Sequence, residues 1–173
     1  MDLEVCKPNF IDKIELNFVN KSTNENPTFA DIGSSGFDLR AWITEENGGE
    51  WLENLQEYCC VLKPLERKLI HTGLYFELPD DKEIQVRPRS GLALKHGITV
   101  LNTPGTVDSS YTGECAVILI NLSNDIYTIK NGERIAQGVL CEVNNGMKVE
   151  LNQIDKITKK TVRGNEGFGH TGK

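Results

Sequence analysis

The sequence predicts an all-β domain built as a sandwich, a jelly roll or a barrel. Three observations favour this class: short β-type runs fill the middle of the chain, turn residues separate them at close spacing, and helical periodicity is scarce. A chain of 173 residues has the length of one ordinary domain and can bury a full core. We therefore expect one β domain over residues 1–155, followed by a C-terminal arm over residues 156–173.

The expected strands are runs that end at turn signals such as Asn131-Gly132. They are IELNFV (14–19), FDLRAWI (37–43), YCCVL (58–62), KLIHTGLYFEL (68–78), EIQVRP (83–88), ITVLN (98–102), ECAVILINL (114–122), IYTIK (126–130), ERIAQGVLCEV (133–143) and KVELNQI (148–154). SGLALKHG (90–97) instead predicts a short helix, with Ser90 as N-cap and Gly97 as C-cap. In residues 45–58, apolar side chains also recur near helical spacing.

Composition and charge narrow the possible partners. The formal net charge is −6 and no block of Lys or Arg is present, which argues against nucleic-acid binding but not against a small phosphate ligand. No apolar run reaches the ~20 residues of a membrane helix, and the N-terminus lacks the order of a signal peptide. The five cysteines form no CxxC pair and are expected as reduced thiols. We therefore expect a cytoplasmic protein with neither a nucleic-acid nor a membrane partner.

RPRSGLALKHG (87–97) is a candidate anion site. A strand ends in Arg87 and Arg89, and Ser90-Gly91 then begins a helix whose N-terminus presents unpaired N–H groups. Gly91 lets an oxyanion approach the backbone. A capped helix beside two surface arginines would give the same pattern.

LNTPGTVDSSYTGE (101–114) has the pattern of a hairpin with Thr103-Pro104-Gly105 at its tip. Asp108 is suited to orient and deprotonate a water, and the Tyr111 ring is suited to pack against a sugar and leave no room for an extra hydroxyl. The two face one ligand only if the chain bends at Ser109-Ser110, since alternate residues of a strand face opposite sides. On spacing alone, a turn aspartate and a half-buried tyrosine are the simpler explanation.

Three further stretches carry polar candidates. In SSGFDLRA (34–41), Asp38 and Arg40 share a strand face, as an exposed ion pair or beside a hydrated metal ion. In GERIAQG (132–138), Gln137 lies in an apolar strand and needs a partner, which the backbone can supply. The final RGNEGFGHTGK (163–173) is either a frayed tail or an arm that closes over a ligand, with Arg163 for charge and Phe168 for stacking.

Taken in chain order, from SSGFDLRA (34–41) to RGNEGFGHTGK (163–173), the five stretches resemble the five motifs of the homotrimeric dUTP pyrophosphatases, the dUTPase family. The resemblance runs from Gly33 to Gly172, and PRSGLA and VDSSYTGE are highly specific to the family and its close relatives. It implies a distorted jelly roll of the β-clip type with one short helix and a flexible glycine-rich C-terminal arm, assembled as a homotrimer with active sites between subunits. The implied reaction is Mg²⁺-dependent hydrolysis of dUTP to dUMP and pyrophosphate, which keeps uracil out of DNA and supplies dUMP for thymidylate synthesis.

The resemblance also implies a role for each site residue. Asp108 would activate the attacking water, Gln137 would place that water or the α-phosphate, and Asp38 would contact the magnesium site through water. The residues that would hold the phosphates are Arg89, Ser90 and Gly91. Those that would read uracil and deoxyribose are Asn102, Gly105, Thr106, Val107 and Tyr111. Those of the arm that would close over a neighbouring subunit's site are Arg163, Phe168, Gly169, His170 and Thr171.

The sequence departs from the family pattern in three places, and two alternative functions remain. Glu166 replaces the first glycine of the family's arm, His170 replaces its serine, and residues 43–58 form a longer stretch than expected. A dCTP deaminase, or a bifunctional deaminase and dUTPase, is similar in fold and needs a catalytic glutamate, for which Glu114 is the candidate. A nucleotide-sensing regulatory protein on the same fold would bind nucleotide with little turnover.

Overall fold

The core of this chain is built from short strands, in several of which buried and partly exposed residues alternate. The computed structural model describes residues 13–165. Its strands are β1 (Asn17–Asn20), β2 (Phe37–Arg40), β3 (Glu50–Leu52), β4 (Glu57–Leu62), β5 (Arg67–Ile70), β6 (Leu74–Glu77), β7 (Lys82–Pro88), β8 (Ile98–Val100), β9 (Gly105–Val107), β10 (Val117–Asn121), β11 (Tyr127–Lys130) and β12 (Arg134–Glu142). The helix α1 (Ser90–His96) follows β7 directly.

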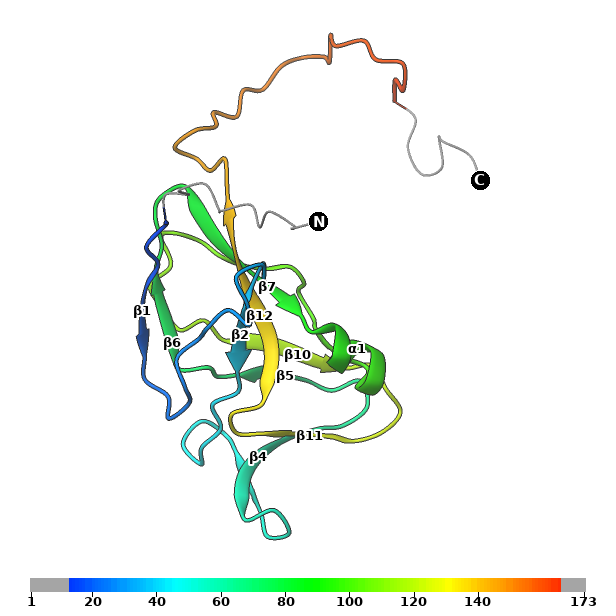
Figure 1. Cartoon of the computed structure of the whole chain (residues 1–173). Coiled ribbons are helices and arrows are strands. Elements are labelled where there is room, and N and C mark those ends of the chain that lie inside the picture. The colour runs from blue at the N-terminus through cyan, green and yellow to red at the C-terminus, as the bar shows by residue number, and fades with distance from the viewer. Residues whose placement is uncertain (1–12, 166–173) are drawn as a thin grey trace, which may run out of the picture. The chain divides into compact units, whose positions relative to one another are not determined.

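The strands form four antiparallel sheets (Figure 1). Buried apolar side chains from these sheets pack together in one core. The sheet orders are β1-β6, β5-β10-β8, β11-β4-β3 and β2-β12-β7-β9. Fully buried core side chains come from all three of the larger sheets, and they include Leu39, Leu62, Ile84, Ile98, Leu119, Ile129 and Ile135. The all-β class with one short helix is thus confirmed for the described residues. Between residues 13 and 165, no helix is long and apolar enough to cross a membrane.

The compact β unit ends at Val143, and a second unit begins at Asn144. Within 144–165 the chain makes local turns, one at 145–148 and one at 161–164, but no strand or helix. The strand expected over residues 148–154 was therefore wrong. Leu151 and Ile154, two of the apolar residues that suggested a strand, are exposed.

Residues 45–58 do not form a helix, despite the helical spacing of their apolar side chains. They form the hairpin of β3 and β4, in which Trp51 lies directly opposite Tyr58. The two rings pack edge to face with their centroids 5.2 Å apart. A chain reversal brings residues seven apart in sequence into contact just as two helical turns would, so spacing alone could not separate the two structures.

The single strand expected over residues 68–78 is two strands, β5 and β6. The interruption lies at 71–73, where Gly73 has a φ of +70°. The N–H groups of Thr72 and Gly73 do not join a sheet there, since both donate to the carboxylate of Glu114. A distant side chain therefore accompanies the end of the strand, and the local sequence signals the break only through Gly73.

The stretch 101–114 is a connection between two sheets rather than a paired hairpin. β8, before its tip, pairs with β10, whereas β9, after its tip, pairs with β7. The two arms therefore hydrogen-bond to different neighbours. Thr103 and Pro104 lie in the turn as predicted, whereas Gly105, also predicted at the tip, is the first residue of β9. We call residues 101–114 the β8–β10 loop below.

Candidate active site

A bulge in β12 brings two polar side chains onto one face. Arg134 lies opposite Arg40 of β2, and Gln137 lies opposite Asp38, so three steps along β12 match two steps along β2. Successive side chains of a regular strand alternate between faces, and residues three apart would then point to opposite sides. The register shift between Arg134 and Ala136 removes this difference and places Arg134, Gln137 and Asp38 on the same face.

Asp38 holds two arginines at this face. Its Oδ1 lies 3.3 Å from Nε of Arg89, and its Oδ2 lies 3.3 Å from Nη1 of Arg134. Arg89 in turn donates from Nη1 to the carbonyl oxygen of Arg134 at 3.0 Å. The ion pair between Asp38 and Arg40 that their spacing suggested does not form, because Arg40 donates to the carbonyl oxygen of Gly132 at 3.0 Å and faces Glu25.

The helix α1 begins beside these arginines without a capping side chain. Its N-cap is Arg89, in extended conformation, so the prediction of Ser90 as N-cap was wrong by one residue. The predicted C-cap is confirmed: Gly97 is left-handed with a φ of 66° and its N–H donates to Ala93. A side chain at Gly91 would meet no protein atom within 4 Å, so the space over the helix start is open to a ligand.

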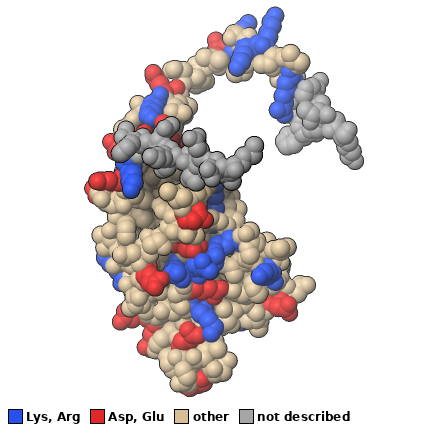
Figure 2. Space-filling model, viewed as in Figure 1, with Lys and Arg blue, Asp and Glu red and all other residues tan. Residues whose placement is uncertain are grey.

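These groups line one open cleft of about 420 Å³. The lining residues are Ala30, Ser34, Ser35, Gly36, Asp38, Arg89, Ser90, Gly91, Arg134 and Gln137. Gln137 is held in place by a bond from its Nε2 to the carbonyl oxygen of Pro88 at 3.1 Å. On the face drawn in Figure 2, Lys and Arg side chains lie interspersed with Asp and Glu and form no continuous basic stripe. Two arginines beside an open helix start suit a small polyphosphate.

Five of the residues that line the cleft were predicted from the sequence, and one residue whose side chain can bind phosphate was not. Asp38, Arg89, Ser90, Gly91 and Gln137 were expected at the site and share the cleft. Arg134 was missed. Its only signal was its charge three residues before Gln137, and without the bulge that spacing would place it on the other face.

The β8–β10 loop presents a second group of expected residues. Asp108 and Tyr111 are exposed, and the N–H of Tyr111 donates to the carbonyl oxygen of Asp108 at 3.0 Å, which makes the predicted bend at Ser109-Ser110. A side chain at Gly105 would lie 3.2 Å from Nδ2 of Asn102, so the glycine lets the two sides of the loop approach. Among residues 13–165, Asn102, Asp108 and Tyr111 do not line the cleft that contains Gln137.

The arm residues are only partly described. Arg163 lies in the exposed turn at 161–164. Phe168, Gly169, His170 and Thr171 lie outside the described residues. Over residues 13–165, no group of three or more His, Cys, Asp or Glu side chains is arranged to hold a metal ion.

The fold and the cleft define a class of protein: a β domain with an open cleft lined by two arginines and the start of a helix. The family model for dUTPase matches residues 55–172. The deoxyuridine 5'-triphosphate nucleotidohydrolase of Cytophaga hutchinsonii is 47% identical over 158 residues, which cover 91% of this chain and 92% of that protein. The chain therefore belongs to the dUTPase family.

Solved structures agree with this fold. The dUTPase of Staphylococcus bacteriophage 80alpha with dUPNHPP matches with a TM-score of 0.75 at 22% identity, covering 92% of this chain and 99% of that chain. A mutant dUTPase from phage phi11 of S. aureus, described as revealing the coordination of a structural Mg(II) ion, matches with a TM-score of 0.68 at 18% identity. It covers 84% of this chain and 100% of that chain. At these identities the likeness shows the fold.

Proposed function

We propose that this chain hydrolyses dUTP to dUMP and pyrophosphate at sites shared between copies of itself. As a member of the dUTPase family it is a hydrolase that acts on dUTP. The observation that carries the shared site is the separation of its parts. Arg89 and Gln137 line the cleft, whereas Asp108 lies on the β8–β10 loop and does not line it. A homotrimer in which the loop of one subunit meets the cleft of the next would unite them.

The cleft binds the triphosphate in this proposal. Arg89 and Arg134 offer guanidinium forks, Ser90 offers a hydroxyl, and the open backbone at Gly91 offers N–H groups. In the described chain both arginines already face Asp38, so the phosphates compete for cations that are held in place in advance. Preorganised cations lose little side-chain freedom when the nucleotide binds.

Asp108 is the general base. Its carboxylate takes a proton from a water that attacks the α-phosphorus, and the bond from that phosphorus to the α,β-bridging oxygen breaks. The electron pair leaves with pyrophosphate, and the added hydroxyl remains on dUMP. Gln137, fixed through Pro88, places the water or the α-phosphate. The exposure of Asp108 leaves its carboxylate free to meet a substrate held by a neighbouring cleft.

Magnesium fits this site as an ion that arrives with the phosphates. Mg²⁺ keeps several waters and is usually held by one or two carboxylates together with substrate phosphates. Asp38 fits an outer position, because both of its oxygens face arginines and a contact through water leaves those ion pairs intact. When bound, the ion neutralises charge on the phosphates.

Selection of the nucleotide falls to the β8–β10 loop. Asn102 and the backbone of Gly105, Thr106 and Val107 read uracil, and Tyr111 packs against the deoxyribose and rejects a 2′-hydroxyl. The arm residues Arg163, Phe168, Gly169, His170 and Thr171 then close over the bound nucleotide from another subunit.

Free thiols at the four described cysteines support a reducing compartment, the cytoplasm, as the place of action.

The geometry of Glu114 favours hydrolysis over deamination. A dCTP deaminase needs a glutamate whose carboxylate is available to the pyrimidine ring. Here the carboxylate of Glu114 lies within hydrogen-bond distance of the backbone N–H groups of Thr72 and Gly73 and of the His71 ring. Because these three contacts hold the Glu114 carboxylate against residues 71–73, it is not available to a pyrimidine ring.

Subunit mixing tests the shared site. Asp108→Asn and Gln137→Ala are each expected to be nearly inactive. When the two variants are denatured together and refolded, sites with an intact Asp108 from one subunit and an intact Gln137 from its neighbour reappear. We expect about a quarter of wild-type activity at a one-to-one ratio, because random trimers pair the intact residues in that fraction of sites. Separately refolded variants mixed afterwards are the control, and a co-refolded sample no more active than this control contradicts the proposal.

A substrate panel tests the selectivity. The protein is incubated with Mg²⁺ and dUTP, dCTP, UTP or dTTP, and nucleoside monophosphate, pyrophosphate and ammonia are followed. dUMP and pyrophosphate from dUTP alone are expected. Ammonia from dCTP would instead assign a deaminase, and nucleotide binding without any product would assign a regulatory protein.

A further inference from the structure

Tyr111 is held in place by the backbone of Glu114. Its hydroxyl donates to the carbonyl oxygen of Glu114 at 3.0 Å. The ring lies directly over Gly113, where an added Cβ would come within 2.6 Å of the ring carbon that carries the hydroxyl. The orientation of this half-exposed ring therefore depends on where the backbone at 113–114 lies.

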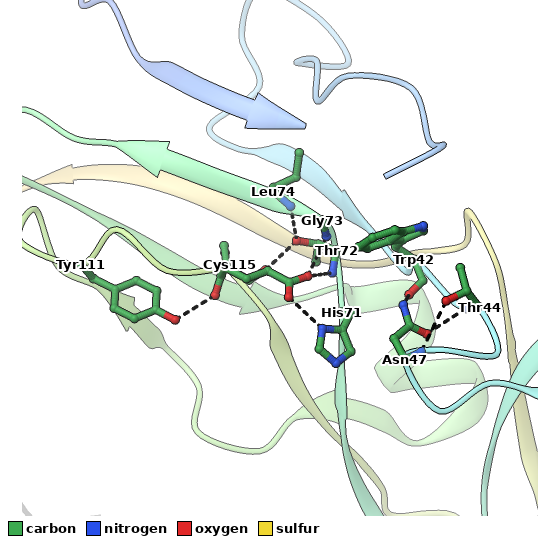
Figure 3. Close-up of polar contacts among 10 residues, drawn as sticks. Trp42, Thr44, Asn47, His71, Thr72, Gly73, Leu74, Tyr111 and Cys115 are labelled. Carbon is green, nitrogen blue, oxygen red and sulfur yellow. Dashed lines mark hydrogen bonds and ion pairs between the residues drawn. The ribbon is translucent and has the colours of Figure 1, made fainter. Parts of the chain in front are cut away.

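The side chain of Glu114 fixes that backbone to a different part of the fold. Its Oε1 accepts from the N–H of Thr72 at 3.0 Å and from that of Gly73 at 2.8 Å, and its Oε2 lies 2.7 Å from Nδ1 of His71. Figure 3 shows His71, Thr72 and Gly73 gathered around these contacts, with the Tyr111 hydroxyl pointing to the chain beside Cys115. One residue thus joins Tyr111 to the connection between β5 and β6.

The anchor on the β5–β6 side is rigid. Thr72 is 1% exposed, and its Oγ1 donates to the carbonyl oxygen of Cys115 at 2.6 Å. Cys115, also buried, donates from its N–H to the carbonyl oxygen of Leu74 at 2.8 Å. Cys115 keeps these bonds when the Glu114 carboxylate is lost, so that loss would loosen the chain only on the N-terminal side of Cys115, where Tyr111 lies.

The Glu114 carboxyl is stabilised in its charged form. Burial acts to raise its pKa, but the hydrogen bonds from His71, Gly73 and Thr72 outweigh burial and hold the pKa below its usual value. A charged acceptor binds backbone N–H groups more strongly than a neutral one. The link therefore persists at neutral pH.

We propose that Glu114 is a positioning residue for the sugar pocket, which sets the preference for deoxyribose over ribose by fixing Tyr111. The inference rests on the proposed role of Tyr111 against the sugar. A ring that must exclude a single hydroxyl has to be held firmly, since a small displacement makes room for the larger sugar. The Glu114 carboxylate acts on Tyr111 indirectly, because it contacts the β5–β6 connection rather than the ring.

The test measures kcat/KM for dUTP and for UTP and compares their ratio among variants. Glu114→Ala removes the anchor, Tyr111→Phe removes only the hydroxyl that meets Glu114, and Tyr111→Ala removes the ring. Glu66→Ala is the matched control, because the Glu66 carboxylate also accepts a backbone N–H, that of Lys63 at 2.8 Å, in a turn elsewhere. Melting temperatures are recorded for all variants, since both glutamates contribute to stability.

We expect the dUTP-to-UTP ratio to fall about tenfold in Glu114→Ala and in Tyr111→Phe, the effect of one lost hydrogen bond. The double variant should fall no further than the larger single one, as for two residues that act through one contact. Glu66→Ala should lower the melting temperature and leave the ratio unchanged. A Glu114→Ala protein that loses stability but keeps its ratio, or effects that simply add, would overturn the proposal.

Two outcomes separate this inference from the function on which it rests. An unchanged ratio in Tyr111→Ala would show that Tyr111 does not select the sugar, and the proposed function of the loop would be wrong. A changed ratio in Tyr111→Ala with an unchanged ratio in Tyr111→Phe would keep that function and reject the link to Glu114. The Tyr111 variants decide this even if Glu114→Ala does not fold.

Discussion

Asp38 and Arg89 form an ion pair at the cleft, with Oδ1 of the first 3.3 Å from Nε of the second. The pair connects the middle of β2 to the start of α1, and Arg134 of β12 completes it from the other side. The cleft therefore contains two cations and one anion before any phosphate arrives.

Asp38→Asn should impair turnover more than nucleotide binding. The substitution removes a negative charge beside the triphosphate, which favours binding, but it weakens the outer contact to magnesium and the alignment of both arginines. We expect kcat to fall about tenfold or more, with the affinity for a non-hydrolysable dUTP analogue changed less. The Mg²⁺ concentration for half-maximal rate should rise. If the Mg²⁺ dependence were unchanged, Asp38 would act only by aligning the two arginines and would have no role at the metal.

Asp108→Asn should bind nucleotide and lose most of its turnover. An asparagine keeps the size of the side chain but accepts no proton from water, and a positioned base contributes ~10²–10⁴-fold to a rate. Calorimetric titration with the analogue gives the affinity, and release of pyrophosphate gives the rate. A variant with near-normal kcat would show that Asp108 is not the general base.

Truncation after Glu166 should leave the assembly intact and cripple catalysis. The deletion removes Phe168 to Thr171, to which the family resemblance assigns the closing of the site, and the β unit that ends at Val143 contains none of them. Light scattering gives the oligomeric state, and steady-state kinetics gives the rate. Full activity in the truncated protein would contradict the lid.

Asn121→Ala should destabilise the fold strongly. Asn121 is fully buried, and its Nδ2 donates to the carbonyl oxygens of Leu62 and Asp125 while its Oδ1 accepts from Ser123. Truncation leaves these partners unpaired, so we expect a loss of ~2–4 kcal/mol in the free energy of unfolding. Urea denaturation measures it. The exposed Asn17→Ala is the control and should change stability by less than ~0.5 kcal/mol.

The stabilising effect of Glu114 should disappear in acid. Because hydrogen bonds lower its pKa in the folded state, the carboxyl contributes stability that is fully present above its unfolded value. That contribution is lost as the pH falls below about 4.5, the usual value, and through the lowered folded value. The difference in unfolding free energy between wild type and Glu114→Gln, measured by urea titration from pH 7 to pH 3, should therefore shrink toward acid. A constant difference across this range would contradict the assignment.

Local features and the chemical identity of most predicted site residues could be derived from the amino-acid sequence alone. β-type runs bounded by turn residues located strands such as β2 and β7, and glycine marked the end of α1 at Gly97. These features depend on neighbours in the chain, which a single sequence displays directly. The five motifs in order also sufficed to indicate the family that the comparisons then showed.

How residues far apart in the sequence meet depends on the folded chain. The bulge that places Arg134 beside Gln137 exists relative to β2, and the break between β5 and β6 coincides with bonds to Glu114. The hairpin of β3 and β4 likewise pairs Trp51 with Tyr58 at a spacing that a helix would share. Register, bulges and strand ends depend on which partner supplies the hydrogen bonds, and local propensity carries no record of that partner.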